Sequence, residues 1–100
     1  MLIGKVEVGA TSADRHAAIR KLVKHDWRDH PQVVSGLLSA AKGDADRAVR
    51  VDGIRHLAAY KVTEPRVLAA LTEMTADNDS WIAKEAAEAL TELMLETVEK

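Results

Sequence analysis

The stretch with the most reactive side chains is residues 25–30, which read His-Asp-Trp-Arg-Asp-His. Imidazole and carboxylate groups are ligands that zinc and other divalent metals take in proteins. This spacing matches no known ligand set, however, and two His residues at opposite ends of an irregular loop share no fixed direction. We therefore interpret the stretch as a polar loop between two helices, with Trp27 covering the helix ends, and expect no bound metal.

The rest of the sequence offers little for catalysis. It contains no Cys, which excludes a thiol nucleophile, a disulfide scaffold and a Cys-ligated zinc site. It also lacks a Gly-rich phosphate loop, a Ser in a nucleophile elbow and paired carboxylates in an apolar setting. His16 and His56 fall at non-equivalent positions of the helical pattern, so they form no His ladder. We expect a protein that is not an enzyme and uses no cofactor.

Length and charge bound the remaining function classes. The chain has 100 residues, of which 47% are hydrophobic, enough for one domain with one core. It is too short for a barrel enzyme or for a doubly wound sheet with a complete cofactor site. The net charge of −2 excludes a strongly basic chain that nucleic acid would hold by bulk charge.

The charges are unevenly distributed along the chain. Residues 1–66 contain 12 basic and 8 acidic residues, whereas residues 67–100 contain 2 basic and 8 acidic residues. One end of the molecule is therefore mildly basic and the other acidic. We interpret this as solvated helix faces, with head-to-tail contact or a polarised partner surface as the alternative.

The sequence contains no apolar run long enough for a signal peptide or a membrane span. We therefore expect a cytoplasmic protein that does not enter a membrane. Residues 1–11 are predicted to be an extended N-terminal tail, and residues 12–100 a single domain.

Helical periodicity dominates the predicted domain. Pro31 and Pro65 suit the first turn of a helix, Gly43 suits the residue after a helix end, and Ser12 suits an N-cap. Asp pairs at residues 44–46 and 77–79 supply further N-caps. The apolar stripes predict five helices, over residues 12–25, 31–42, 46–61, 65–76 and 80–97.

The helical pattern repeats along the chain with an offset of 33–35 residues. In the most regular copy, Asp44, Asp46, Val49, Gly53 and Leu57 recur as Asp77, Asp79, Ile82, Ala86 and Leu90. A two-helix unit of this length, present about two and a half times, indicates a solenoid rather than a closed bundle. Small residues such as Gly53 are expected to let the first helices of the repeats approach closely.

The pattern Asp-x-Asp-x-x-Val-Arg-x-x-Gly that begins at Asp44 resembles the first helix of HEAT-like repeats, most closely the short repeat of the phycobilisome-lyase type. The pattern Pro-x-Val-Leu that begins at Pro65 is similar to the second helix of the same family. The resemblance covers about residues 12–93. It implies an all-α fold, a short right-handed superhelix of two and a half helical hairpins. It also implies that Arg50 is a rung of an Asp–Arg ladder between repeats, and Ala83 departs from the family by replacing the usual Arg.

The second helices of such repeats line the concave side of the solenoid, a small and mildly polar surface that suits a protein or peptide. Lys42 shares this ridge. We therefore predict a non-catalytic protein–protein interaction or scaffolding module whose partner docks on the ridge. The candidate partner-binding residues are Gln32, Ser35, Ser39, Arg66, Thr72 and Glu73.

Two other functions remain open. The first is weak, sequence-independent nucleic-acid binding by a basic flank on the first and third helices, although interspersed Asp residues interrupt this flank. The residues of this flank are Arg15, Arg20, Lys24, Arg28 and Arg55. The second is an accessory repeat domain of a larger enzyme, as HEAT-like repeats occur in bilin lyases and attached to peptidases.

The last predicted helix begins a third repeat whose second helix is missing, and it carries a row of Glu residues beside an apolar face. Three outcomes are open: the helix docks on its neighbours and ends the stack, a second copy completes it in a dimer, or the chain belongs to a longer solenoid. Of these we favour the first. Trp81 is expected to fill space between repeats rather than to anchor a partner.

Overall fold

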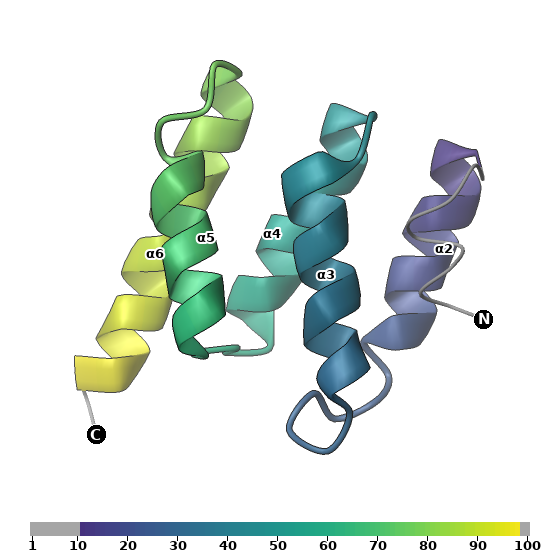
Figure 1. Cartoon of the computed structure of the whole chain (residues 1–100), viewed down its shortest axis with the longest axis horizontal. Coiled ribbons are helices and arrows are strands. Elements are labelled where there is room, and N and C mark those ends of the chain that lie inside the picture. The colour runs from purple at the N-terminus through teal and green to yellow at the C-terminus, as the bar shows by residue number, and fades with distance from the viewer. Residues whose placement is uncertain (1–10, 99–100) are drawn as a thin grey trace.

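The computed structural model describes residues 11–98, which form five α-helices and no strand (Figure 1). The helices are α2 (Ser12–Leu22), α3 (Pro31–Gly43), α4 (Arg47–Ala59), α5 (Pro65–Met74) and α6 (Ser80–Val98). The all-α prediction is confirmed, with helix ends that differ from the expected ones by up to three residues. The predicted extended tail lies outside the described residues except for Thr11.

The five helices lie in two layers (Figure 1). α3 and α5 form the front layer, and α2, α4 and α6 form the layer behind it. α3 packs against α4 and α5 packs against α6, so each second helix covers the first helix of the following repeat. The Cα atoms extend over 37 × 33 × 16 Å, which describes a flat slab. This arrangement is an all-α helical-repeat solenoid, as the residue period predicts.

Polar residues fix where the helices begin. The N-cap of α2 is Thr11, whose side chain accepts a hydrogen bond of 3.2 Å from the Asp14 backbone N–H. Ser12 was therefore the wrong choice of N-cap, since it is the first residue of the helix itself. α3 and α5 begin with the predicted Pro residues at Pro31 and Pro65, where the missing N–H removes no helical hydrogen bond.

The C-terminal ends of α3 and α4 also differ from the prediction by one or two residues. α3 includes Gly43 as its last residue, and Asp44 follows as the C-cap with an extended backbone. Gly43 is thus not the residue beyond the helix end. Two residues beyond the end of α4, Lys61 adopts the left-handed region at φ 57°. The next amide, that of Val62, donates to the Leu57 carbonyl at 3.0 Å. This bond pattern is a Schellman cap, and it directs buried Val62 back onto the core.

The core lies between the two layers and is built from the apolar stripes of all five helices. Ile19, Leu37, Leu57, Leu71 and Ile82 are fully buried. No polar or charged residue is buried with them among the residues whose burial the structure describes. Close packing of branched side chains therefore joins one repeat to the next.

Gly53 marks a close approach between α4 and α3. A Cβ atom at this position would lie 3.0 Å from the Leu37 carbonyl oxygen and 3.1 Å from the Ala41 nitrogen. Both atoms belong to the backbone of α3. The prediction that Gly53 brings first helices together is thus wrong, because the contact joins a first helix to the second helix before it.

Trp27 lies in the loop between α2 and α3, half-buried against the core. Its indole Nε1 donates a hydrogen bond of 2.9 Å to the Tyr60 carbonyl at the end of α4. Trp27 therefore ties the first loop to the second repeat, beyond the two helices that it was expected to cover. No helix within the described part of the chain is long and apolar enough to cross a membrane.

Candidate protein-interaction groove

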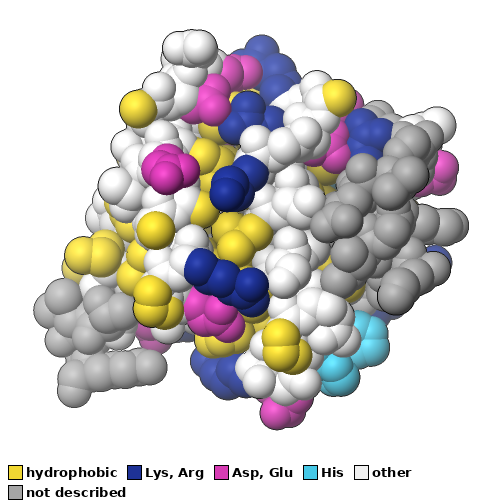
Figure 2. All heavy atoms as spheres, in the orientation of Figure 1, with side chains coloured by type: hydrophobic (Ala, Val, Ile, Leu, Met, Phe, Trp, Pro, Cys, Tyr) yellow, Lys and Arg dark blue, Asp and Glu magenta, His cyan; other side chains and the backbone are white. Residues whose placement is uncertain are grey.

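An open groove of about 510 Å³ runs between α3 and α5 on the front face of the slab. Figure 2 shows Lys and Arg side chains beside apolar side chains along the middle of this face. We name this feature the α3–α5 groove, and it is lined by Ser35, Leu38, Ser39, Lys42, Gly43, Arg66 and Ala70.

The helical period explains why these residues line the groove. Ser35, Ser39 and Lys42 follow one another at intervals of four and three residues, which place them on one side of α3. The adjacent side of the helix carries Val34 and Leu37, which are fully buried. The same sequence pattern that buries one side of α3 thus turns hydroxyl and ammonium groups toward solvent.

The lining of the groove contains two cations, of which Arg66 is paired with a neighbouring carboxylate and Lys42 is exposed. Arg66 donates from Nε to Glu64 Oε1 at 2.8 Å and from Nη1 to Ser35 Oγ at 3.3 Å, so its guanidinium is held across the groove. Lys42 is exposed at the other end of the lining. None of the lining residues is acidic. Half-buried Leu38 and buried Ala70 form the apolar part of the lining.

The structure brings together half of the predicted partner-binding residues. Ser35, Ser39 and Arg66 line the groove, while Gln32, Thr72 and Glu73 are exposed outside it. The Thr72 hydroxyl donates to the Leu68 carbonyl of its own helix at 2.7 Å. The Gln32 amide nitrogen lies 3.4 Å from His30 Nδ1. Lys42, which was expected on the same ridge, and Leu38 also line the groove, although neither was in the predicted partner-binding set.

A ladder of ion pairs joins the repeats at the end of the slab where α4 and α6 begin. Arg50 donates from Nη2 to Asp77 Oδ2 at 2.8 Å, and Arg15 donates from Nε to Asp44 Oδ2 at 2.6 Å. The two pairs are one repeat apart, so the ladder implied for Arg50 is confirmed. It ends at Ala83, where the third repeat lacks an Arg.

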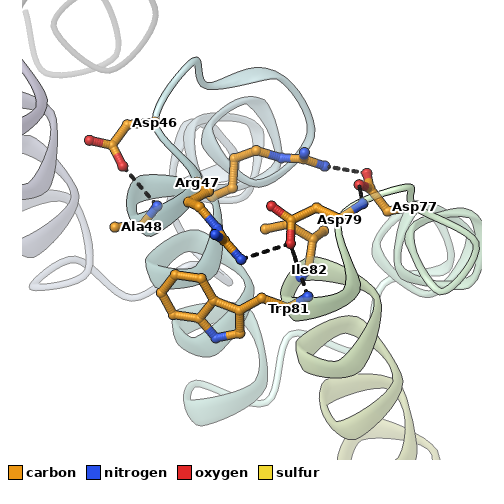
Figure 3. Close-up of polar contacts among 8 residues, drawn as sticks. Asp46, Arg47, Ala48, Asp77, Asp79, Trp81 and Ile82 are labelled. Carbon is orange, nitrogen blue, oxygen red and sulfur yellow. Dashed lines mark hydrogen bonds and ion pairs between the residues drawn. The ribbon is translucent and has the colours of Figure 1, made fainter.

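The turns that carry the ladder are built alike in both repeats (Figure 3). Asp46 accepts the Ala48 N–H at 2.8 Å, and Asp79 accepts the Trp81 N–H at 2.9 Å. Arg47 donates to Asp79 at 3.0 Å and stacks over the ring of Trp81, with its guanidinium carbon 4.8 Å from the ring centroid. Trp81 is half-buried against the core, in agreement with its expected role between repeats.

The ladder makes the free energy of unfolding decrease at acidic pH. The hydrogen bond from Arg50 and the Asp79 backbone N–H hold the pKa of Asp77 below its ordinary value. The stabilisation by Asp77 is complete above about pH 4, the ordinary pKa of Asp, and decreases as the pH falls through the lowered pKa of the folded state.

We therefore expect Asp77→Asn to lower the thermal unfolding midpoint at neutral pH and to approach the unmodified protein as the pH falls well below about 4. Thermal unfolding followed by circular dichroism over this pH range measures the difference. Asp29→Asn, a change of the same charge in the exposed loop before α3, serves as the control. A difference between Asp77→Asn and the unmodified protein that grows toward acidic pH would contradict the assignment.

The basic flank proposed for nucleic acid is divided by ion pairs. Arg15 is bound to Asp44, and Arg55 donates two hydrogen bonds of 3.0 Å to the carboxylate of Glu85. Arg28 lies 3.8 Å from Asp26. Arg20 on α2 and Lys24 in the turn after it are both exposed. These pairs neutralise part of the flank and argue against a continuous phosphate-binding stripe.

The sequence did not predict one polar cluster, which links α2 to α4. Asp52 of α4 lies between two imidazoles, with His16 Nδ1 3.0 Å from Oδ2 and His56 Nε2 3.3 Å from Oδ1. His16 belongs to α2, so the cluster links two neighbouring first helices. Within the described residues, no group of three or more His, Cys, Asp or Glu side chains is arranged to hold a metal ion.

The two-layer stack, the repeated Asp turns and the Arg ladder define a helical-repeat protein of the solenoid class. The family model for HEAT repeats matches residues 9–91, and the chain belongs to this family. No curated protein and no solved structure matches the chain. HEAT repeats generally mediate protein–protein interaction or scaffolding and are typically non-catalytic. The narrower phycobilisome-lyase type stays a prediction.

Proposed function

We propose that the chain is a non-catalytic interaction module that binds an acidic peptide segment of a partner protein in the α3–α5 groove. The observation that carries the proposal is the composition of the groove. The lining combines Lys42 and Arg66 with apolar Leu38 and Ala70 and with two Ser hydroxyls. The carboxylate beside it, that of Glu64, is already bonded to Arg66.

Each part of the groove has a counterpart in such a peptide. Carboxylate side chains pair with Lys42 and Arg66, and an aliphatic side chain between them covers Leu38 and Ala70. The hydroxyls of Ser35 and Ser39 can hydrogen-bond to the peptide backbone. The groove volume of about 510 Å³ is typical of clefts that hold a ligand. Because the groove is open, we expect binding that is weak and sensitive to salt.

Charge reversal in the groove tests this proposal. A fluorescent peptide of alternating Glu and Leu should bind the unmodified protein, and fluorescence anisotropy measures its affinity. Lys42→Glu combined with Arg66→Glu should weaken binding by more than about a hundredfold, because two attractive charges become repulsive. Circular dichroism should show an unchanged helix content, since both residues are exposed.

The matched control is Arg20→Glu combined with Lys24→Glu, which changes the net charge equally but lies at the end of α2, in the other layer. This variant should bind the peptide as the unmodified protein does. Equal loss of binding in both variants would mean that net charge, not the groove, attracts the peptide. Full binding by the groove variant would show that the partner docks elsewhere. A cytoplasmic location remains part of this proposal.

A further inference from the structure

The outer faces of α2, α4 and α6 carry a gradient of charge. The repeat offsets of 35 and 33 residues make Arg20, Arg55 and Glu88 equivalent positions of the three helices. Lys24, Ala59 and Glu92 are related by the same offsets, although Lys24 lies in the turn just after α2. All six residues are exposed. The same face is therefore basic on α2, close to neutral on α4 and acidic on α6.

This face lies on the opposite side of the slab from the α3–α5 groove. Exposed Arg55 and Ala59 of α4 and exposed Glu88 and Glu92 of α6 line a shallow groove of about 320 Å³ between these helices. The sides of α4 and α6 that face the front layer are buried. The charged residues therefore project away from α3 and α5, and we call this surface the first-helix face.

We propose that the first-helix face binds a second copy of this chain, in a dimer whose two-fold axis runs along α4. A rotation about this axis places α2 of each copy against α6 of the other. Arg20 then faces Glu88 and Lys24 faces Glu92, and symmetry supplies the same contacts a second time. When the first-helix faces of two copies meet, only this arrangement places each basic end opposite an acidic one.

The centre of the face is compatible with the two-fold axis. In the dimer, Arg55 would lie near Arg55 of the second copy. The charge of each Arg55 is already compensated by two hydrogen bonds of 3.0 Å to Glu85 of the same chain. Ala59 beside it is small and allows close approach. The Cα extents of 37 × 33 Å leave room for the roughly 800 Å² per partner that a stable interface buries. Exposed ion pairs are screened by salt, so the dimer should form at low ionic strength.

Sedimentation velocity of the full chain tests the proposal. At low salt the mass should rise with protein concentration from 10.9 kDa toward about twice that value, and high salt should reverse the change. Glu88→Lys with Glu92→Lys makes both ends basic, and Arg20→Glu with Lys24→Glu makes both ends acidic. Each variant alone should dimerise more than about tenfold more weakly.

Mixing the two variants should restore a dimer, since each basic end then meets an acidic one. Lys42→Glu with Arg66→Glu is the matched control, because it changes charge on the other face and should dimerise normally. This control separates the dimer from the proposed peptide site, so either can fail alone. A monomer at every concentration in low salt would overturn the proposal. Growth of the mass beyond a dimer would overturn the two-fold arrangement in favour of an open head-to-tail chain.

Discussion

Leu57→Ala should lower the free energy of unfolding by about 2–5 kcal/mol. Leu57 is fully buried in α4, the helix that packs against α3 on one side and α6 on the other. Truncation removes the apolar contacts of the side chain and leaves a cavity between two repeats that the close-packed helices cannot fill. Urea unfolding followed by circular dichroism measures the loss.

Leu95→Ala makes the same chemical change at an exposed position, where the residue is 57% accessible to solvent. It should change the free energy of unfolding by no more than about 0.5 kcal/mol. Leu71 is fully buried in α5, so Leu71→Ala should lower the free energy of unfolding by a similar amount to Leu57→Ala. Equal and small costs at Leu57 and Leu71 would mean that neither residue holds the two layers together.

The helices could be predicted because each is specified by signals within its own turns. Apolar residues at helical spacing mark the buried stripes, Pro31 and Pro65 mark two helix starts, and the Asp turns mark two more. The errors lie where neighbouring residues share the same chemistry. Thr11 and Ser12 are both good N-caps, and only the backbone conformation decides between them.

The end of α2 shows a second limit of local signals. Val23 continues the apolar stripe, which predicts a helix as far as residue 25, but α2 ends at Leu22. The amides of Lys24 and His25 donate to carbonyls three residues back, so the last turn tightens before the loop. The stripe persists because Val23 packs against the core from this turn.

The candidate site could be predicted only in part, because a sequence shows which residues share a helix face but not what faces them. The spacing of Ser35 and Ser39 placed them on one ridge, and Arg66 was expected on the next. The partners of Arg15 and Arg55 are carboxylates about thirty residues away, so both appeared in the sequence as unpaired cations. The contact of His16 with Asp52 was missed for the same reason, because these two residues are also far apart in the sequence.

The ladder of ion pairs was predictable because it repeats. Arg15 and Arg50 precede the same apolar pattern, and Asp44 and Asp77 open the same turn. The family resemblance then supplied the pairing between them. The second hydrogen bond of Arg50 could not be predicted from the sequence: its Nε donates to the Ala41 carbonyl of α3 at 2.9 Å. Arg50 thus joins α3, α4 and the turn before α6.

Arg50→Ala should lower the free energy of unfolding by about 1–3 kcal/mol, because it leaves the Ala41 carbonyl and the Asp77 carboxylate without their Arg partner. The Arg50 and Asp77 side chains are only 18% and 22% exposed, so water replaces the lost bonds incompletely. Urea unfolding measures the cost, and a double-mutant cycle with Asp77→Ala isolates the energy of the pair.

Arg47→Ala is a close control, because Arg47 lies on the same helix and pairs with Asp79 of the same turn at 3.0 Å. Its side chain is 56% exposed, so its ion pair contributes about 0–1 kcal/mol and its stacking on Trp81 about 0.5–1 kcal/mol. The larger cost should therefore fall on Arg50, which bonds to two neighbouring segments at once. An Arg47→Ala cost equal to that of Arg50→Ala, with no coupling between Arg50 and Asp77, would show that apolar packing alone joins the repeats.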